Sequence, residues 1–252
     1  MEKKKAVISL SGGLDSTMLL MTLLSEGYEV RAYAFDYGQK HTIELEKVQK
    51  NIKFLQEEKH LPVTLQIINL RDCFSDSASS LHSSNDENIP QGHYEEESMK
   101  STVVEQRNVI FSAIIYGKAL GWSKKSNSDV VITLGIHAGD HTIYPDTTPE
   151  SQEAAKHLFK ISNWGSERVD YIAPFAHISK SQVLECGVDA MGEMNFWDTE
   201  IDYVLSNTHS CYSPDEKGRS CGKCGTCVER LEAFEACGMR DPIEYVDDVI
   251  VV

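Results

Sequence analysis

The chain has 252 residues, of which 41% are hydrophobic, and this suffices for one sizeable buried core. Its 39 acidic residues against 24 basic ones give a formal net charge of −15, which disfavours a large nucleic-acid partner. No apolar run approaches the length of a membrane span, and the N-terminal residues do not have the pattern of a secretory signal peptide. The chain contains seven cysteines. We therefore expect a cytoplasmic protein without a nucleic-acid or membrane partner, in which clustered thiols bind metal.

Hydrophobic patterning predicts that strands and helices alternate along the chain. The predicted elements are, in order, a strand at 6–10, a helix at 18–24, a strand at 30–35, a helix at about 43–58, a strand at 63–70, a helix at about 108–120 and a strand at 130–135. The segment 73–100 is polar and lacks periodicity, so we expect a long loop there. The alternation predicts a Rossmann-like α/β fold, a parallel sheet with helices on both faces and ligands at the carboxyl ends of the strands.

The segment between the first strand and the first helix, Ser11–Thr17, reads SGGLDST. Backbone N–H groups at the start of a helix can bind phosphate, glycines allow close approach, and hydroxyls add donors. An ordinary turn is the alternative, but it leaves the hydroxyls and Asp15 unexplained. The loop is not a Walker motif, because Asp15 stands in place of lysine, and its two adjacent glycines do not form a dinucleotide fingerprint. We therefore expect a nucleotide-dependent enzyme.

Four cysteines late in the chain follow the pattern C-x9-C-G-x-C-x2-C. Four thiolates at such spacing are typical of a closed, tetrahedral structural zinc site. An iron–sulfur cluster is one alternative, and unrelated cytosolic cysteines are another. The expected Zn²⁺ ligands are Cys211, Cys221, Cys224 and Cys227. Three other cysteines stand alone in the sequence and are expected to be small buried apolar residues, namely Cys73, Cys186 and Cys237.

The SGGLDST loop resembles the SGGxDS signature of the PP-loop ATP pyrophosphatase superfamily, whose members cleave ATP between the α and β phosphates and transfer AMP to a substrate oxygen. Further segments in matching order make most of the chain, from about residue 6 to residue 236, similar to the 7-cyano-7-deazaguanine synthase family. These segments are Phe35–His41, Arg107 with Asn108, Gly135 with Asp140, Tyr144–Asp146, Lys180, and Asn207–Tyr212 before the cysteines. Each is weak by itself, but their order and spacing together are specific.

The resemblance implies an adenylating PP-loop α/β domain at 1–205 and a zinc-binding module packed on it at 206–252. It implies the cofactors ATP, Mg²⁺ and Zn²⁺, a homodimer, and the small-molecule substrate 7-carboxy-7-deazaguanine. The substrate carboxylate would be adenylated, ammonia would displace AMP to give an amide, and a second ATP would activate the amide oxygen, whose loss leaves a nitrile. Such a ligase of queuosine biosynthesis works by positioning reactants and neutralising charge.

The same resemblance implies roles for individual residues. Expected catalytic residues are Asp15, Ser16, Arg107 and Lys180, the two cations neutralising phosphate or carboxylate unless they are solvated surface charges. Expected ATP and Mg²⁺ contacts are Leu10, Ser11, Gly12, Gly13, Leu14, Asp15, Ser16, Thr17, Phe35 and Gly135; for Phe35, a place in the core is equally compatible. Expected substrate contacts are Tyr37, Gln39, Arg107, Asn108, Asp140, Tyr144 and Asp146. One of the two aspartates would accept hydrogen bonds from the guanine-like ring, although both are also common turn residues.

The sequence departs from the family pattern at the expected substrate end of the site. The family usually reads Cys-Arg-Pro-Glu-Phe after Tyr-Pro-Asp, whereas this chain has Thr147, Thr148, Pro149, Glu150 and Ser151; Glu105 stands where a proline usually precedes the Arg-Asn pair. Loss of an arginine removes a bidentate donor for a carboxylate or phosphate. The chain could therefore be a divergent relative that joins the adenylated deazapurine carboxylate to another amine or a protein. A tRNA-modifying PP-loop enzyme and a non-catalytic binding module are also compatible with the sequence.

Overall fold

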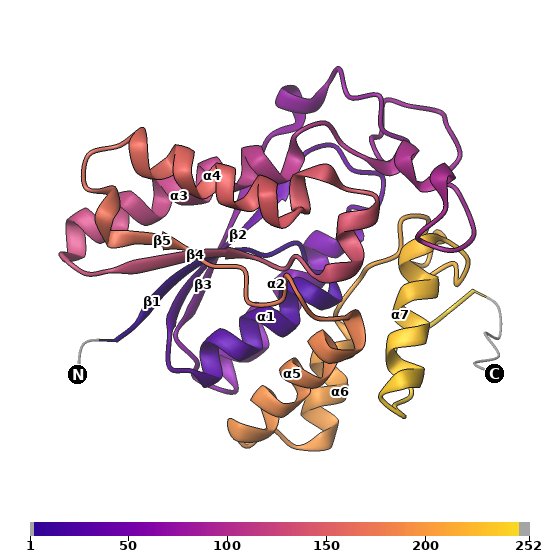
Figure 1. Cartoon of the computed structure of the whole chain (residues 1–252). Helices are drawn as coiled ribbons and strands as arrows, with labels where there is room; N and C mark the ends of the chain where they lie inside the picture. The colour runs from indigo at the N-terminus through magenta and orange to yellow at the C-terminus, as the bar shows by residue number, and fades with distance from the viewer. Residues whose placement is uncertain (1–2, 247–252) are drawn as a thin grey trace.

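The computed structural model describes residues 3–246, apart from the side chains of His141 and Thr142. Within these residues, five strands form one parallel sheet in the order β3-β2-β1-β4-β5 (Figure 1). The strands are β1 (Lys5–Ser9), β2 (Glu29–Asp36), β3 (Val63–Asn69), β4 (Val130–Leu134) and β5 (Val169–Tyr171). The strand order reverses between β1 and β4, and in such sheets ligands bind at the carboxyl ends of the strands beside this point.

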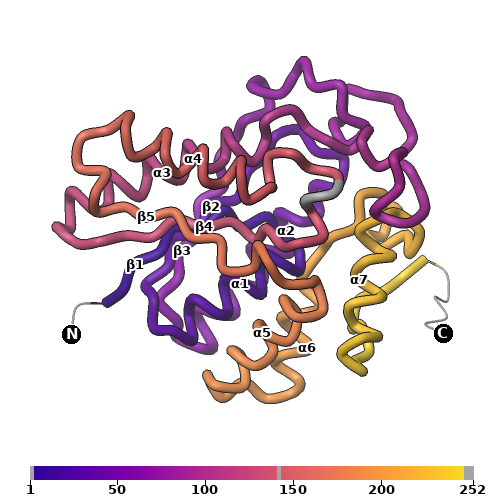
Figure 2. The backbone as a smooth tube through the Cα atoms, viewed as in Figure 1, coloured from indigo at the N-terminus to yellow at the C-terminus, as the bar shows by residue number. Residues whose placement is uncertain are grey.

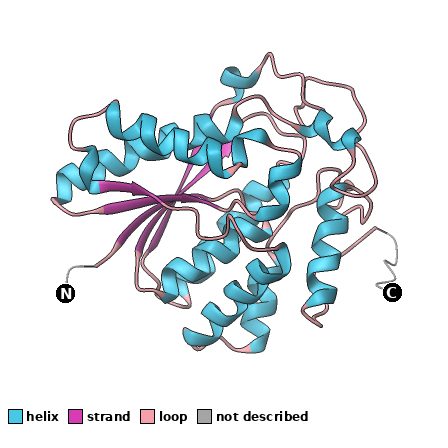
Figure 3. Cartoon of the chain, viewed as in Figure 1, coloured by secondary structure: helices cyan, strands magenta, loops and turns pink. Residues whose placement is uncertain are grey.

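Helices cover both faces of the sheet (Figure 3). On one face lie α3 (Arg107–Ser126) and α4 (Pro149–Ile161), and on the other lie α1 (Leu14–Ser25), α2 (Ile43–Glu57), α5 (Lys180–Glu193), α6 (Asp198–Ser206) and α7 (Gly225–Ala236). Because successive side chains of a strand point to opposite faces, each face has its own hydrophobic core. Ile8 of β1 packs in the core that includes α1, and Val7 packs in the core that includes α3. The predicted α/β fold is thus confirmed.

Local capping interactions decide where two helices begin. Ser179 Oγ accepts a hydrogen bond from the N–H of Gln182, and Gln182 Oε1 accepts one from the N–H of Ser179, so that α5 starts at Lys180. At the start of α3, the carboxylate of Asp146 accepts hydrogen bonds from the N–H and the Nδ2 of Asn108, both at 3.1 Å. Both helix N-termini lie at the edge of the sheet where β1 and β4 end.

The segment expected to be a long loop, residues 73–100, has little regular structure but is well packed. It contains the last residues of the 3-10 helix η1 (Arg71–Phe74) and the first of η2 (Glu97–Thr102), and Leu81 in its middle is fully buried. Gln91 forms an isolated antiparallel bridge with Cys224. Figure 2 shows this purple segment above the yellow C-terminal helix. The segment is therefore one wall of the cysteine-containing region.

The C-terminal part of the chain shares the main core. Phe234 of α7 belongs to the same buried cluster as β1 and α1, and α7 packs against α5. The expected module boundary between residues 205 and 206 stays a prediction, and residues 247–252 of that module lie outside the described residues. Among residues 3–246, the helices all fall short of the length and apolar character that a bilayer crossing requires.

Candidate active site

A cavity of about 200 Å³ lies at the carboxyl edge of the sheet, where the loops after β1, β2 and β4 meet the first turns of α3, α5 and α7. The predicted site residues in its wall are Ser11, Gly13, Asp15, Ser16, Tyr37, Arg107, Asn108, Gly135, Asp140, Tyr144 and Lys180. Residues from widely separated parts of the sequence therefore face a single space. This space lies beside the point where the strand order reverses, as expected for a ligand site in such a sheet.

The loop after β1 presents hydroxyls and helix N–H groups to this cavity. Gly12 has a φ of 93°, and a Cβ there would lie 2.6 Å from the carbonyl oxygen of Glu44, so both conformation and space demand glycine. α1 begins at Leu14, earlier than predicted, and the first N–H groups of a helix have no intrahelical acceptor. The Oγ atoms of Ser11 and Ser16 lie 3.0 Å apart. The arrangement has the form of an anion-binding helix terminus.

A buried ion cluster forms beside this loop. Lys180 Nζ lies 3.0 Å from Asp15 Oδ2 and 2.8 Å from Glu229 Oε2. Burial opposes the positive charge, but the two carboxylates hold the pKa of Lys180 above its ordinary value. Burial would raise the pKa of Asp15, yet Lys180 and His137 hold it below its ordinary value. Both groups of the pair are therefore charged at neutral pH.

Arg107 brings a second cation to the cavity. Its Nη1 donates a hydrogen bond to the Tyr37 hydroxyl at 3.3 Å. Within residues 3–246, none of the carboxylates pairs with this guanidinium at ion-pair distance. Its other neighbours in the cavity wall include Tyr144 and Tyr212, whose hydroxyls lie 3.0 Å apart. A cation with neutral neighbours in a concave site is suited to an anionic ligand group.

Other predicted site residues lie behind the cavity wall. Leu10 and Leu14 belong to the hydrophobic core, and Phe35 is 4% exposed with its ring stacked on Phe111 at a centroid distance of 4.0 Å. Thr17 Oγ1 donates to the carbonyl oxygen of Gly13 at 2.8 Å and so stabilises the start of α1. The remaining residues outside the wall are Gly12, Gln39 and Asp146. These positions support the site from behind.

The structure also places in the wall residues that the sequence did not predict to be there, among them His41, Glu44, Tyr212 and Glu229. His137 joins them as a buried neighbour, with Nε2 3.5 Å from Glu229 Oε1. Glu229 lies on α7, a helix that was not predicted. Glu44 lies on α2, which carries many charged residues, so the sequence does not distinguish this buried glutamate from the exposed ones. The available signals were His41 and Tyr212, which stand within matched segments of the sequence.

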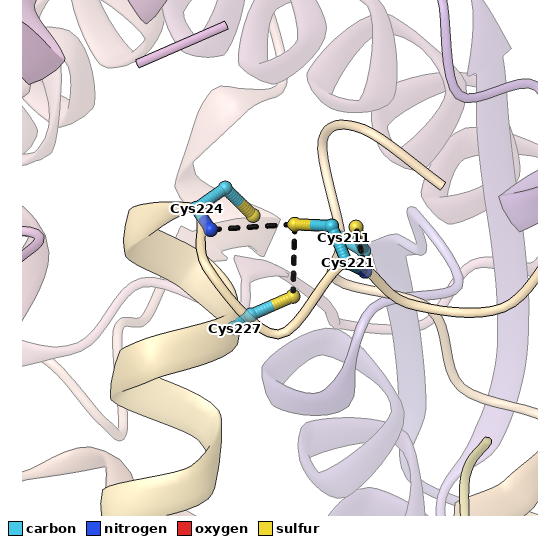
Figure 4. Close-up of side chains that lie close together, drawn as sticks. All are labelled: Cys211, Cys221, Cys224 and Cys227. Atoms are coloured by element: carbon cyan, nitrogen blue, oxygen red, sulfur yellow. Dashed lines mark hydrogen bonds between the residues drawn. The ribbon is translucent and has the colours of Figure 1, made fainter. Parts of the chain in front are cut away.

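The four clustered cysteines form a group that could hold a metal ion (Figure 4). Their Sγ atoms all lie within 4.8 Å of one another. Backbone N–H groups point at the sulfurs: Cys221 N–H donates to Cys211 Sγ at 3.2 Å, and Cys224 N–H to Cys221 Sγ at 3.3 Å. Such hydrogen bonds stabilise thiolates and orient them around a metal.

The three cysteines outside this group do not all behave as predicted. Cys73 and Cys186 are exposed, so the expectation that they are buried is wrong, and Cys237 is partly buried. Cys73 lies in η1 and Cys186 on α5. The prediction rested on the average burial of cysteine, which cannot report on which face of a helix the side chain lies.

Comparison with known proteins gives a coherent family assignment. A family model described as queuosine biosynthesis protein QueC matches residues 5–238. A 7-cyano-7-deazaguanine synthase from Methanoregula boonei is 41% identical over 96% of this chain and 99% of its own length. A protein of the same name from Marinomonas is 41% identical over 96% of this chain and 98% of its own. Among solved structures, an NMN synthetase from Francisella tularensis matches 94% of this chain and 79% of its own at 14% identity and a TM-score of 0.42, which is too distant to support any conclusion.

Proposed function

The chain belongs to the queuosine biosynthesis protein QueC family, and we propose that it converts 7-carboxy-7-deazaguanine to 7-cyano-7-deazaguanine with ATP and ammonia. The observation that carries the proposal is the cavity, in which a PP-loop, a buried lysine–aspartate pair and Arg107 surround one space. An adenylating enzyme needs this combination, because it must hold ATP and a carboxylate together although both are anions.

The proposed reaction uses two molecules of ATP. A carboxylate oxygen attacks the α-phosphorus, pyrophosphate leaves, and an acyl adenylate forms. Ammonia then attacks the acyl carbon, AMP leaves with the oxygen, and the nitrogen loses a proton to give the amide. The amide oxygen attacks the α-phosphorus of a second ATP with loss of pyrophosphate. Departure of AMP with that oxygen and loss of the two remaining N–H protons leave the nitrile.

We assign each part of the reaction to particular residues of the cavity. The hydroxyls of Ser11 and Ser16 and the first N–H groups of α1 bind the phosphates, and Lys180 neutralises charge that develops on the departing pyrophosphate. Arg107 binds the substrate carboxylate and holds one of its oxygens in line with the α-phosphorus. The side chains thus act by orientation and charge, and none of them forms a bond to the substrate.

Mg²⁺ fits beside the PP-loop. Asp15 Oδ1 is buried and accepts no hydrogen bond from the described residues, so it is a carboxylate oxygen in need of a cation. Asp15 would hold the ion, whose contribution there is neutralisation of the phosphate charge.

Zn²⁺ fits the four-cysteine group. Tetrahedral coordination with Zn–S bonds of about 2.3 Å places the sulfurs ~3.8 Å apart. Cys221 Sγ and Cys227 Sγ are 4.0 Å apart, and all four sulfurs lie within 4.8 Å. A polynuclear iron–sulfur cluster must accommodate several atoms between its thiolates, so this close grouping favours a single ion. Zn²⁺ would stabilise the segment that carries the four cysteines, residues 211–227, which we call the cysteine knuckle.

The departure from the family pattern lies close to the cavity. Thr147 lines the cavity, and its Oγ1 donates to the carbonyl oxygen of Tyr144 at 2.7 Å. Thr148, at the position of the usual arginine, caps α4 by accepting from the N–H of Ser151. This difference supports a second candidate function, conjugation of the adenylated carboxylate to an amine other than ammonia. Homodimer formation and a cytoplasmic location are further parts of the proposal, taken from the family resemblance.

One experiment tests both candidate functions. The purified protein is incubated with ATP, Mg²⁺ and 7-carboxy-7-deazaguanine, with and without ammonium, and the products are identified by mass spectrometry. We expect the nitrile, AMP and pyrophosphate, with formation of the nitrile dependent on ammonium. A product that retains the mass of another amine would favour conjugation, and an absence of AMP would contradict both functions.

A further inference from the structure

Glu44, in the first turn of α2, is a buried carboxyl group that faces the cavity. It is 7% exposed, whereas Glu46, two residues further along the same helix, is exposed. Burying an acidic side chain is costly unless other groups satisfy its oxygens. We therefore expect a hydrogen-bonding partner for the carboxyl group of Glu44 in the cavity.

Gln39 holds Glu44 in place from behind. Its Nε2 donates to Glu44 Oε1 at 2.8 Å and to the carbonyl oxygen of Phe35 at 3.1 Å, and its Oε1 accepts from the N–H of Tyr37 at 2.9 Å. The amide is thus fully engaged and fixes the orientation of the carboxyl group. Glu44 Oε2 lies 3.6 Å from His41 Nε2, beyond hydrogen-bond distance, and accepts no hydrogen bond from the described residues.

The surroundings of Glu44 suit a flat ring. Tyr37, His41 and Tyr212 line the same cavity, and the rings of His41 and Tyr212 lie 5.6 Å apart. Arg107 contacts the Tyr37 hydroxyl and supplies a cation to this region. A ligand that carries an anionic group at one end and hydrogen-bond donors at the other would satisfy both Arg107 and Glu44.

The two heterocyclic rings of the proposed reaction, the deazaguanine of the substrate and the adenine of ATP, differ in their hydrogen-bond donors. A guanine-type ring presents N1–H and an exocyclic amino group side by side, which together match the two oxygens of a carboxylate. An adenine ring presents an acceptor at N1 beside its amino group, so a carboxylate would face a lone pair. Glu44 is therefore complementary to the deazaguanine ring and not to the adenine of ATP.

The aspartates expected from the sequence to bind this ring have other partners in the structure. The two carboxylate oxygens of Asp146 accept hydrogen bonds from Asn108 at the start of α3. Asp140 Oδ2 accepts from the N–H of His137 at 3.1 Å, and its Oδ1 lies 3.7 Å from His137 Nε2. Glu44 differs from Asp146, because one of its oxygens is not hydrogen-bonded within the described chain. It differs from Asp140 in its surroundings, because Asp140 lies among the charged groups of the ion cluster, whereas Glu44 lies near Arg107 and the aromatic side chains.

We propose that Glu44 is the specificity-determining residue for the ring, accepting hydrogen bonds from N1–H and the 2-amino group while Arg107 binds the carboxylate at the other end. This inference rests on the proposed function. It assigns ring recognition to α2, and it assigns a positioning role to Gln39, which contacts Glu44 and does not line the cavity.

The test compares two substrates on two variants. Pyrophosphate release is measured for Glu44→Gln and for the control Glu46→Gln, with 7-carboxy-7-deazaguanine and with its analogue lacking the 2-amino group. We expect the wild type and the control to prefer the natural substrate by about 10-fold to 100-fold in kcat/KM. Glu44→Gln should lose most of this preference with an unchanged KM for ATP. Because the preference is a ratio on one protein, partial unfolding of a variant does not alter it.

Two results would overturn the inference: an undiminished preference in Glu44→Gln, or a raised KM for ATP. Failure of the proposed function has a different signature, because the wild type would then release no pyrophosphate with either substrate. In that case calorimetric binding of 7-deazaguanine, which has no carboxylate to adenylate, still tests ring recognition. Binding at least tenfold weaker to Glu44→Gln than to Glu46→Gln supports it, and equal binding refutes it.

Discussion

Lys180 and Glu44 are buried in the wall of the same cavity, but their surroundings drive their protonation in opposite directions. Lys180 contacts two carboxylates, which outweigh the cost of burying its charge. Glu44 contacts the neutral amide of Gln39, and burial raises the pKa of its carboxyl group to about 8. The charge of a buried group therefore follows from its partners and not from its residue type. Before the ring binds, the enzyme is expected to hold a charged lysine and a largely neutral glutamic acid, and Glu44 must release its proton to accept both hydrogen bonds of the ring.

This difference has a measurable effect on stability. Because the pKa of Glu44 is raised from 4.5 to about 8, the folded state binds a proton that the unfolded state releases. The stabilisation is present in full below pH 4.5 and is lost as the pH rises through 8. Each pH unit of displacement in a pKa corresponds to about 1.4 kcal/mol. We expect the free energy of unfolding of Glu44→Gln to fall by several kcal/mol less than that of the wild type between pH 5 and pH 8.5, measured by urea denaturation.

A control comes from His41 in the same cavity wall. Burial lowers the pKa of His41 from 6.5 to about 3, so its contribution is present above pH 6.5 and is lost as the pH falls toward 3. His41→Asn should therefore flatten the acid side of the stability profile and leave the alkaline side unchanged. Parallel profiles for Glu44→Gln and the wild type above pH 5 would contradict the assigned burial of Glu44.

At the scale of elements, the site depends on how closely the end of β4 approaches the start of α1. A Cβ on Gly135 would lie 2.7 Å from both the Cα and the N of Ser16. Both of these are backbone atoms, so they cannot move aside as a flexible side chain would. The lack of a side chain at Gly135, the residue after β4, thus allows the start of α1 to pack directly against this backbone.

We expect Gly135→Ala to push the PP-loop out of position. Such overpacking should destabilise the fold by about 1–3 kcal/mol. Displacement of the phosphate-binding groups should lower kcat for pyrophosphate release by about tenfold or more. Gly117→Ala is the matched control, because this exposed glycine lies in α3 and a Cβ there meets nothing within 4 Å. The control should be slightly more stable and fully active; a fully active Gly135→Ala would show that the close approach is unnecessary.

At the scale of the whole molecule, the cysteine knuckle is joined to the active site by α7. The helix begins at Gly225, between the last two cysteines, and its Glu229 reaches Lys180 at 2.8 Å. Arg230, on the next position, is fully buried and pairs with Asp241 at 2.6 Å. We therefore expect a change at the four cysteines to shift the carboxylate of Glu229 in the cavity. We also expect metal binding at the cysteines and adenylation in the cavity to be linked through α7.

Metal removal should consequently lower both stability and activity. We expect one Zn²⁺ per chain by elemental analysis, and we expect Cys224→Ser to lose the metal, unfold at a lower temperature and release pyrophosphate more slowly. Cys73→Ser changes an exposed cysteine outside the group and should match the wild type in all three measurements. Iron with a visible absorption band would contradict the zinc assignment, and an active metal-free protein would contradict the linkage through α7.

Signals confined to a few neighbouring residues were readable in advance. The alternation of strands and helices up to residue 135 predicted the fold correctly, and the cysteine spacing predicted a group that could hold a metal ion. The SGGLDST segment lies at the junction of β1 and α1, as its place in the sequence predicted. The capping box of Ser179 and Gln182 and the Thr148-Pro149 start of α4 were also local signals that could have revealed later helices. Such features are recognisable because backbone conformation and ligand spacing depend on adjacent residues.

The sequence by itself determined the glycine-rich loop between β1 and α1, the grouping of four cysteines that could hold a metal ion, and the class of fold, because each depends on short-range chemistry. Only the tertiary structure decided the partners of the charged groups. It placed Phe35 and Asp146 behind the cavity wall and brought Glu44 and Glu229 into it. The reason is physical: a glutamate in a charged helix has the same local pattern whether it faces solvent or a cavity. Its burial depends on packing against residues far away in the chain.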